Sequence, residues 1–224
     1  MEEDTKSIES KLSPLLRMIA HDLKGLLGTP GLLISLAESA RDDEDRVTTL
    51  ASLREAFRAL DRALDDVGDL GAVVGDPPAS SPQPTDARAL LIDVLALAQP
   101  AGVQRKIELV SEVAPGPWPA VVVDGKVLKR TFERLVYWGI SKSANDARVV
   151  VSAAFENGAI RLRVPAGKGA PHAVPTVLER LQEIDRDTRE LALALPLARE
   201  TLERHGGSLT VHDGVLEAKI PAGN

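Results

Sequence analysis

The segment "RMIAHDLKGLLGTPGLL", residues 17–33, places a histidine–aspartate pair inside an apolar helical pattern. Working outward over residues 6–40, apolar residues recur at steps of three and four: Leu12, Leu16, Ile19, Leu23, Leu26, Pro30, Leu33 and Ala37. Such a heptad pattern is typical of a helix that packs in a bundle, and Leu15, Leu27 and Ile34 widen its apolar stripe. The glycines and proline at 28–31 are poor helix formers, so we expect a kink or weak point there.

A second heptad pattern follows a charged turn. The segment "ARDDEDR", 40–46, contains aspartates suited to cap a helix. The pattern beyond it consists of Leu50, Leu53, Phe57, Leu60, Leu64 and Val67. Two helices joined by a short turn form an antiparallel hairpin, and a helix of about 30 residues is about 45 Å long. One such hairpin cannot bury both of its apolar sides, so we expect a twofold dimer with a four-helix bundle. The alternative is a hairpin that packs on the rest of its own chain.

The segment "GDPPASSPQPTDAR", 75–88, is rich in proline, serine and glycine and breaks the helical pattern. It predicts a linker at 76–88, between a helical hairpin domain at 1–75 and a second domain at 89–224. Thr85 and Asp86 are candidates to cap the next helix.

The second domain mixes helical and strand patterns. Helices are expected at 85–102, 125–144, 176–184 and 190–207, the last ending at Gly206. Strands are expected at 106–114 and 120–125, with hairpins at 147–167 and 208–222 that turn at "ENG" and "DG". Because the order is irregular and most neighbouring strands are hairpin-linked, the predicted fold class is α+β, with helices layered on a sheet.

The composition restricts the possible classes of protein. The 224 residues are 44% hydrophobic and 27% charged, as in a globular protein. A net charge of -6 argues against a nucleic-acid partner, and the absence of cysteine excludes disulfides and thiolate metal sites. The charged N-terminus is unlike a signal peptide, and no apolar run approaches the ~18 residues that cross a bilayer. We therefore expect a cytoplasmic protein without a membrane partner.

The order of these parts resembles the catalytic core of two-component sensor histidine kinases. "AHDLKGLL", 20–27, resembles the H-box of their phosphotransfer hairpin, and 121–143 resembles the strand, turn and N-box helix of their ATP-binding domain. "VPAGKGAP", 164–171, and 190–211 stand where the two glycine boxes belong. The resemblance extends from about residue 10 to 222. It implies a dimerising hairpin followed by a Bergerat-type α/β sandwich domain.

The nucleotide-binding motifs of that family are altered here. The N-box asparagine that helps to hold magnesium matches Tyr137, with Glu133 at the other polar N-box position. The aspartate that reads adenine is replaced by Pro165 or Ala166.

The glycine boxes differ as well. Gly167, Lys168 and Gly169 remain in the first box, whereas "TRELALALP", 188–196, offers no glycine in the second. Phosphates need free backbone N–H groups and a metal, and a helix has already committed its amides. We therefore expect no ATP binding and no autokinase activity.

His21 is the candidate phosphoacceptor. It lies two residues from both Ile19 and Leu23, so its ring should point away from the bundle core. An imidazole is a usable nucleophile near neutral pH when its other nitrogen has a partner. The resemblance implies that Asp22 assists phosphoryl transfer and that Lys24 shields phosphate charge. The alternative is that the pair is only a polar helix face.

Two neighbours of His21 depart from the family pattern. Gly25 stands where many kinases have a Thr or Asn that positions a hydrolytic water, and Leu26 stands where they have Pro. A strong phosphatase activity is therefore not expected.

The other candidate residues receive structural interpretations. His172 is placed in a loop, His205 before a helix-ending glycine pair and His212 in an exposed hairpin. No spacing suggests a metal site. Lys129, Arg130 and Arg134 are interpreted as a solvated helix face, and Tyr137 and Trp138 are expected to pack where a nucleotide would otherwise sit.

Two functions from different classes remain. The leading hypothesis is a histidine phosphotransferase that relays a phosphoryl group between response-regulator receiver domains. It would work as a homodimer, without ATP or a cofactor of its own, because Mg²⁺ belongs to the receiver. The alternative is a non-enzymatic pseudokinase scaffold that binds a receiver or a kinase. An active kinase with a divergent nucleotide pocket is a third possibility.

Overall fold

The computed structural model describes residues 2–75, 81–167, 171–183 and 192–222, and it describes only the backbone of 2–14 and 74. The chain forms two compact units. One comprises Met1–Val74 and Val177–Leu193, and the other comprises Gly75–Thr176 and Ala194–Asn224. The described residues 177–183 and 192–193 thus group with the hairpin, whereas the sequence analysis expected a second domain at 89–224.

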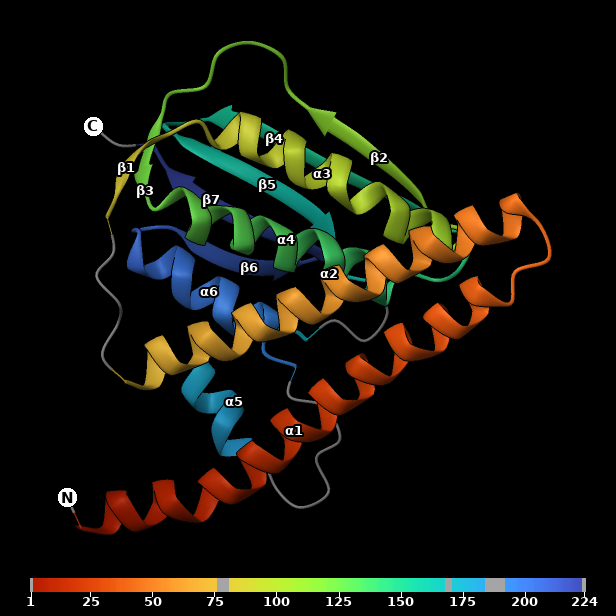
Figure 1. Ribbon diagram of the computed structural model, residues 1–224. Helices are drawn as coiled ribbons and strands as arrows, with labels where there is room; N and C mark the ends of the chain where they lie inside the picture. Colours follow the sequence, from red (N-terminus) through yellow and green to blue (C-terminus); the bar gives the residue numbers. More distant parts are fainter. Residues whose placement is uncertain (1, 76–80, 168–170, 184–191, 223–224) are drawn as a thin grey trace. The chain divides into compact units, whose positions relative to one another are not determined.

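The first unit is built on the hairpin of α1 (Glu2–Glu38) and α2 (Asp43–Val74), with the short α5 (Val177–Glu183) as its third helix (Figure 1). Asp42 begins α2, because its carboxylate Oδ1 accepts a hydrogen bond of 2.8 Å from the backbone N–H of Asp45. This confirms the predicted aspartate cap. None of the helices in the described part of the chain is long and apolar enough to cross a bilayer.

α1 continues without interruption through residues 28–31. The expected weak point therefore does not break the helix. Pro30 cannot donate its backbone hydrogen bond, but its side chain is buried, and that burial offsets part of the cost.

The two heptad patterns are only partly buried. On α1 the half-buried side chains include Ile19, Leu23, Leu26 and Leu33. On α2 every second member of the pattern stays exposed: Leu50, Phe57 and Leu64. The hairpin thus has an apolar stripe on its surface, as expected of a helix pair that cannot bury both of its sides.

A five-stranded sheet organises the second unit, in the order β2-β4-β5-β7-β6. β2 (Glu108–Val113) runs parallel to β4 (Arg148–Glu156), whereas β5 (Ala159–Pro165), β7 (Val215–Pro221) and β6 (Ser208–His212) pair in antiparallel fashion.

The two predicted hairpin turns are confirmed. Asn157 and Gly158, and likewise Asp213 and Gly214, all have positive φ angles, between 49° and 76°. Both central residues of a type I′ turn need such angles, and Asn-Gly and Asp-Gly tolerate them.

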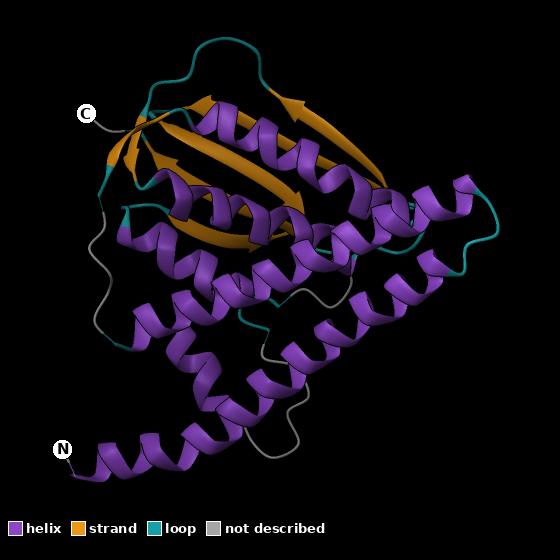
Figure 2. Ribbon diagram, viewed as in Figure 1, coloured by secondary structure: helices purple, strands orange, loops and turns teal. Residues whose placement is uncertain are grey.

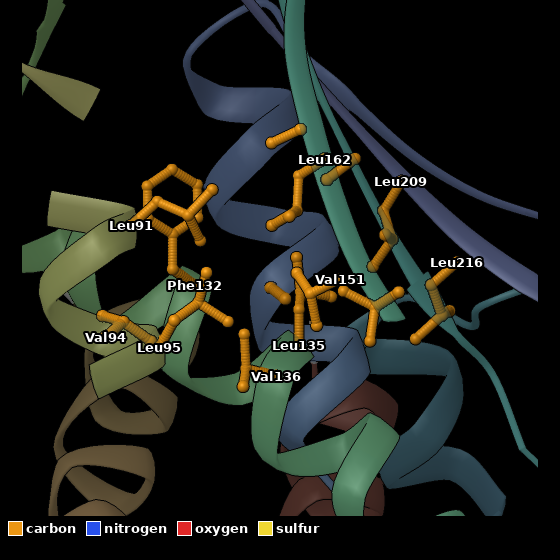
Figure 3. Close-up of a cluster of buried hydrophobic side chains, with 14 of the residues drawn as sticks. Leu91, Val94, Leu95, Phe132, Leu135, Val136, Val151, Leu162, Leu209 and Leu216 are labelled. Carbon is orange, nitrogen blue, oxygen red and sulfur yellow. The ribbon is translucent and has the colours of Figure 1, made fainter. Parts of the chain in front are cut away.

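Three helices cover one face of this sheet: α3 (Ala87–Gln104), α4 (Gly125–Lys142) and α6 (Ala194–Arg204) (Figures 1 and 2). α4 lies between the other two and contacts both. Side chains of the helices and of the sheet meet in one apolar cluster that includes Phe132, Leu135 and Leu162 (Figure 3). The predicted α+β class is confirmed.

The expected linker contains a strand that the sequence analysis missed. β1 (Gln83–Thr85) pairs antiparallel with β3 (Val121–Val123), apart from the main sheet. The Thr85 hydroxyl donates to the Val123 carbonyl at 3.1 Å. Pro84 is tolerated because, among the residues that the structure describes, β1 pairs with a single strand. Of the two predicted cap candidates, Asp86 caps α3 through a 3.0 Å hydrogen bond from the Ala89 N–H, so the helix begins at 87, within the expected linker.

α6 begins later than predicted. Residues 190–191 lie outside the described residues, Ala192 has a φ of 49°, and the helix starts at Ala194. Pro196 accounts for this start, because proline is accepted in the first turn and not deeper in a helix. The argument that helical amides are already committed therefore does not apply to Ala192 and Leu193. The predicted end at Gly206 is confirmed, with a φ of 71°.

Candidate functional site

His21 lies on the outward side of α1, where 80% of its side chain is exposed. Its Nδ1 is 3.2 Å from Asp22 Oδ1. Ile19 and Leu23, which flank it by two residues, are half-buried. The heptad that packs the helix therefore also turns this ring towards solvent, as the sequence analysis expected.

The surface around the ring carries little bulk. Lys24 and Gly25 are both exposed, and a Cβ at Gly25 would meet no atom within 4 Å. Gly28, one turn further along the same side, is equally open. Gly25 and Gly28 therefore place no side chain in the way of a folded partner that approaches His21 along this side of α1.

The arrangement has a direct chemical consequence. When Nδ1 carries the ring proton, it donates to the Asp22 carboxylate and leaves Nε2 as an exposed lone pair. A neutral imidazole held in this way can attack an electrophilic phosphorus atom, and the carboxylate stabilises the positive charge that develops on the ring. Among the described residues, no group of three or more His, Asp or Glu side chains could hold a metal ion.

The α4 helix directs its two neighbouring aromatic rings to different places. The Trp138 Nε1–H donates to the Ala166 carbonyl at 3.2 Å, just beyond β5, and Lys142 Nζ lies 4.8 Å from the Trp138 ring centroid. The Tyr137 hydroxyl instead donates to the Leu97 carbonyl of α3 at 3.3 Å. The sequence analysis matched Tyr137 to the N-box position and placed both rings in the nucleotide region. In the structure Trp138 faces the segment after β5, and Tyr137 joins α4 to α3.

The segment after β5 packs tightly on α4. Ala166 is fully buried, and its backbone N–H donates to the Gly214 carbonyl at 2.7 Å. Gly167 has a φ of 73°, and a Cβ there would come within 2.6 Å of Lys142 Cβ. Lys168 and Gly169 lie outside the described residues. Neither Pro165 nor Ala166, the two positions that the sequence analysis matched to the adenine-binding aspartate, carries a carboxylate.

One interpretation of the α4 charges is wrong. Arg134 was assigned to a solvated face, but it is 6% exposed. The reason is that α4 is the middle helix of the layer and is covered from two sides. Lys129 fits the solvated interpretation better: it is 41% exposed and lies 3.8 Å from Glu133.

The sequence analysis missed a charged network on the sheet. Glu217 of β7 accepts hydrogen bonds from Arg161 Nη1 and from Arg163 Nε, at 2.5 and 2.8 Å. The hydrogen bond from Arg163 lowers the pKa of the Glu217 carboxyl below its ordinary value. The strand register could have revealed the pair, because Arg163 and Glu217 are direct cross-strand partners.

The remaining histidines are exposed to solvent or contact a backbone carbonyl. His172 and His212 are exposed. His205 Nδ1 lies 2.8 Å from the Thr201 carbonyl, where it satisfies a carbonyl in the last turn of α6.

No model of a known protein family matches the chain. Over 164 residues it is 29% identical to the sensor protein DivL of Caulobacter vibrioides. That region is 70% of this chain and 20% of DivL, so the chain spans only a small part of this curated relative.

Solved structures of histidine kinases share the fold. The histidine kinase AdeS of Acinetobacter baumannii has a TM-score of 0.55 at 16% identity, over 91% of this chain and 98% of that one. Histidine kinase ThkA in complex with the response regulator protein TrrA has 0.56 at 16% identity, over 99% and 65%. Full-length ShkA in complex with AMPPNP has 0.54 at 19% identity, over 92% and 44%. The chain therefore has a histidine-kinase-like architecture.

Proposed function

We propose that the protein is a histidine phosphotransferase. His21 takes a phosphoryl group from the aspartate of one response-regulator receiver domain and passes it to another, without using ATP. The observation that carries this proposal is the His21 ring, which is 80% exposed and oriented by Asp22 on a helix of histidine-kinase-like architecture.

The proposed transfer is an in-line displacement. His21 Nε2 attacks the phosphorus of the receiver's aspartyl phosphate, so an N–P bond forms while the P–O bond to the aspartate breaks. The Nδ1 proton stays on the ring, and the Asp22 carboxylate stabilises the resulting positive charge. Lys24 lies on the exposed side and contributes positive charge near the phosphoryl oxygens. The second receiver reverses the step, and Mg²⁺ comes with each receiver.

Features of the second unit support independence from ATP. Ala166 supplies no carboxylate for an adenine amino group, and its carbonyl is engaged by the Trp138 indole. Tyr137, which matches the N-box asparagine in the sequence, is a bulky and poor magnesium ligand. ShkA was solved in complex with AMPPNP, but at 19% identity that complex supports no nucleotide binding by this chain.

The partners follow from the same architecture. The ThkA complex contains a response regulator, which supports a receiver domain as the partner here. An apolar stripe on the hairpin supports a homodimer: its side chains are 40–57% exposed, and they are Leu16, Leu27, Ile34, Leu50, Phe57 and Leu64. Two such hairpins bury these stripes together in a four-helix bundle.

A transfer assay tests this function. The protein is incubated either with labelled ATP and Mg²⁺ or with a phosphorylated receiver, beside a His21→Gln variant of the same size. We expect label on the protein from the receiver only and none on the variant. Label from ATP alone would show a kinase. Tight receiver binding without any label would show a scaffold.

A further inference from the structure

The C-terminal half of α4 approaches the end of β5 closely because two glycines allow it. A Cβ at Gly139 would come within 2.5 Å of Val164 Cγ1, and one at Gly167 would come within 2.6 Å of Lys142 Cβ. Real Cβ atoms essentially never show contacts below 3.0 Å. The two glycines therefore fix a short separation between α4 and the segment that follows β5.

Trp138 lies in this contact region and is held by three kinds of interaction. Its ring N–H donates to the buried Ala166 carbonyl at 3.2 Å. The Lys142 ammonium group lies 4.8 Å from the ring centroid, within range of a cation–π attraction. The ring is partly buried and packs against the apolar core of the unit.

These interactions are the ones by which proteins bind free planar heteroaromatic molecules. Such sites are mainly apolar, and a few polar groups fix the orientation of the ligand. Here the Ala166 carbonyl accepts a hydrogen bond from the ring N–H, the Lys142 ammonium group lies over a ring face, and the apolar core packs against the ring. Trp138 differs from a free ligand only in its covalent link to α4.

We propose that Trp138 is a built-in ligand of the second unit. Its indole fills a site for a planar heteroaromatic molecule with an N–H donor, and the site accepts such a molecule from solution once the side chain is shortened. In the unaltered chain the site is always occupied, so the second unit is complete without a small molecule. This inference concerns the second unit alone, and it stands whether or not His21 carries phosphate.

The test compares the two tryptophans of the chain, because Trp118 is also partly buried against the same core. We expect Trp138→Ala to lower the melting temperature by about 5 °C. Indole at millimolar concentration should then raise it in a saturable manner, as ligand linkage requires. Neither the unaltered protein nor Trp118→Ala should be stabilised.

A shape-matched probe isolates the hydrogen bond. Benzofuran has the shape of indole but no N–H, so it leaves the Ala166 carbonyl unpaired. We expect it to bind Trp138→Ala at least about tenfold more weakly than indole. Equal binding of both probes, or no effect of indole on a variant with an unchanged circular dichroism spectrum, would overturn the proposal.

A measurement on the unaltered chain covers the case in which Trp138→Ala does not fold. Proton–nitrogen correlation NMR spectra resolve the ring N–H groups of both tryptophans. We expect the Trp138 ring N–H to exchange with solvent at least about tenfold more slowly than that of Trp118, because it is hydrogen-bonded to a buried carbonyl. If the Trp138 ring N–H exchanged with solvent as fast as that of Trp118, the proposal that its ring is bound in a site would be contradicted.

Discussion

In the proposed transfer, the contact between His21 Nδ1 and Asp22 Oδ1 leaves Nε2 as the nitrogen that reacts. An Asp22→Asn variant keeps the size of the side chain but removes its charge. We expect phosphoryl transfer from a receiver to slow by about tenfold or more, because the ring's positive charge is then less stabilised. Rapid-quench kinetics measure this rate. An unchanged rate would mean that the carboxylate takes no part in the reaction.

Substitutions at Gly25 test what limits the lifetime of the proposed phosphohistidine at His21. Because a Cβ at Gly25 meets nothing within 4 Å, Gly25→Ala fits without displacing a neighbour, and Gly25→Thr adds its γ atoms on the exposed side of α1. In the resembling kinases a Thr at this position positions a hydrolytic water. We expect Gly25→Thr to shorten the half-life of phosphorylated His21 several-fold, and Gly25→Ala to leave it unchanged. Equal half-lives would show that hydrolysis is limited elsewhere.

Glu217 should make the second unit sensitive to acid. The hydrogen bond from Arg163 lowers the folded-state pKa of Glu217 below the ordinary 4.5. The unfolded state therefore binds more protons in this range, so the stabilisation is present above pH 4.5 and is lost as pH falls through the folded-state value. Glu217→Gln should cost less than about 1 kcal/mol at neutral pH, because the arginines are partly exposed, and nothing in strong acid. Urea unfolding curves at several pH values check this; a constant difference would contradict it.

At the scale of elements, the sequence predicted those turns and helix ends that require particular residue types at one or two positions. The turns at Asn157–Gly158 and Asp213–Gly214 and the helix end at Gly206 need positive φ angles, which the sequence signals directly. β1 was missed because its pairing with β3 is a contact between residues far apart in the chain.

The directions of the Tyr137 and Trp138 rings could not be predicted from the residues next to them in the sequence. Tyr137 and Trp138 are adjacent, and a one-residue difference turns a ring by about 100° around a helix. Only packing decides that Trp138 faces Ala166 and that Tyr137 faces Leu97. The outward position of His21 could be predicted, because a long heptad fixes the rotation of α1. Asp22 was a candidate partner of the ring, but which ring nitrogen it contacts depends on side-chain rotamers and could not be predicted.

Two helical glycines should respond in opposite ways to alanine. At Gly139 the added methyl group would clash with Val164, so we expect Gly139→Ala to destabilise the second unit by about 1–3 kcal/mol. At Gly28 the methyl group meets nothing, so Gly28→Ala should stabilise α1 by about 0.5–1 kcal/mol. Denaturant titrations of both variants measure the signs. Stabilisation by Gly139→Ala would contradict the close approach of α4 to β5, and destabilisation by Gly28→Ala would contradict the open surface at Gly28.

At the scale of the whole molecule, the exposed stripe on α1 and α2 should hold two copies together. Phe57 is 48% exposed on this stripe, and Val122 of β3 is 53% exposed elsewhere. We expect Phe57→Glu to convert a dimer into a monomer, because it places a charge in an apolar interface. Val122→Glu is the matched control and should leave the dimer intact. Light scattering after size-exclusion chromatography measures the mass, and a Phe57→Glu variant that stays dimeric would place the interface elsewhere.

The most direct test of the central claim is to locate the phosphoryl group after reaction with a phosphorylated receiver. Phosphorus NMR of the purified protein distinguishes a phosphoryl group on either imidazole nitrogen from one on an oxygen. The account predicts one signal from His21 Nε2 in the sample treated with the receiver, and none in a sample treated with ATP and Mg²⁺. A phosphohistidine signal in the ATP sample, or a signal from another residue after receiver treatment, would contradict it.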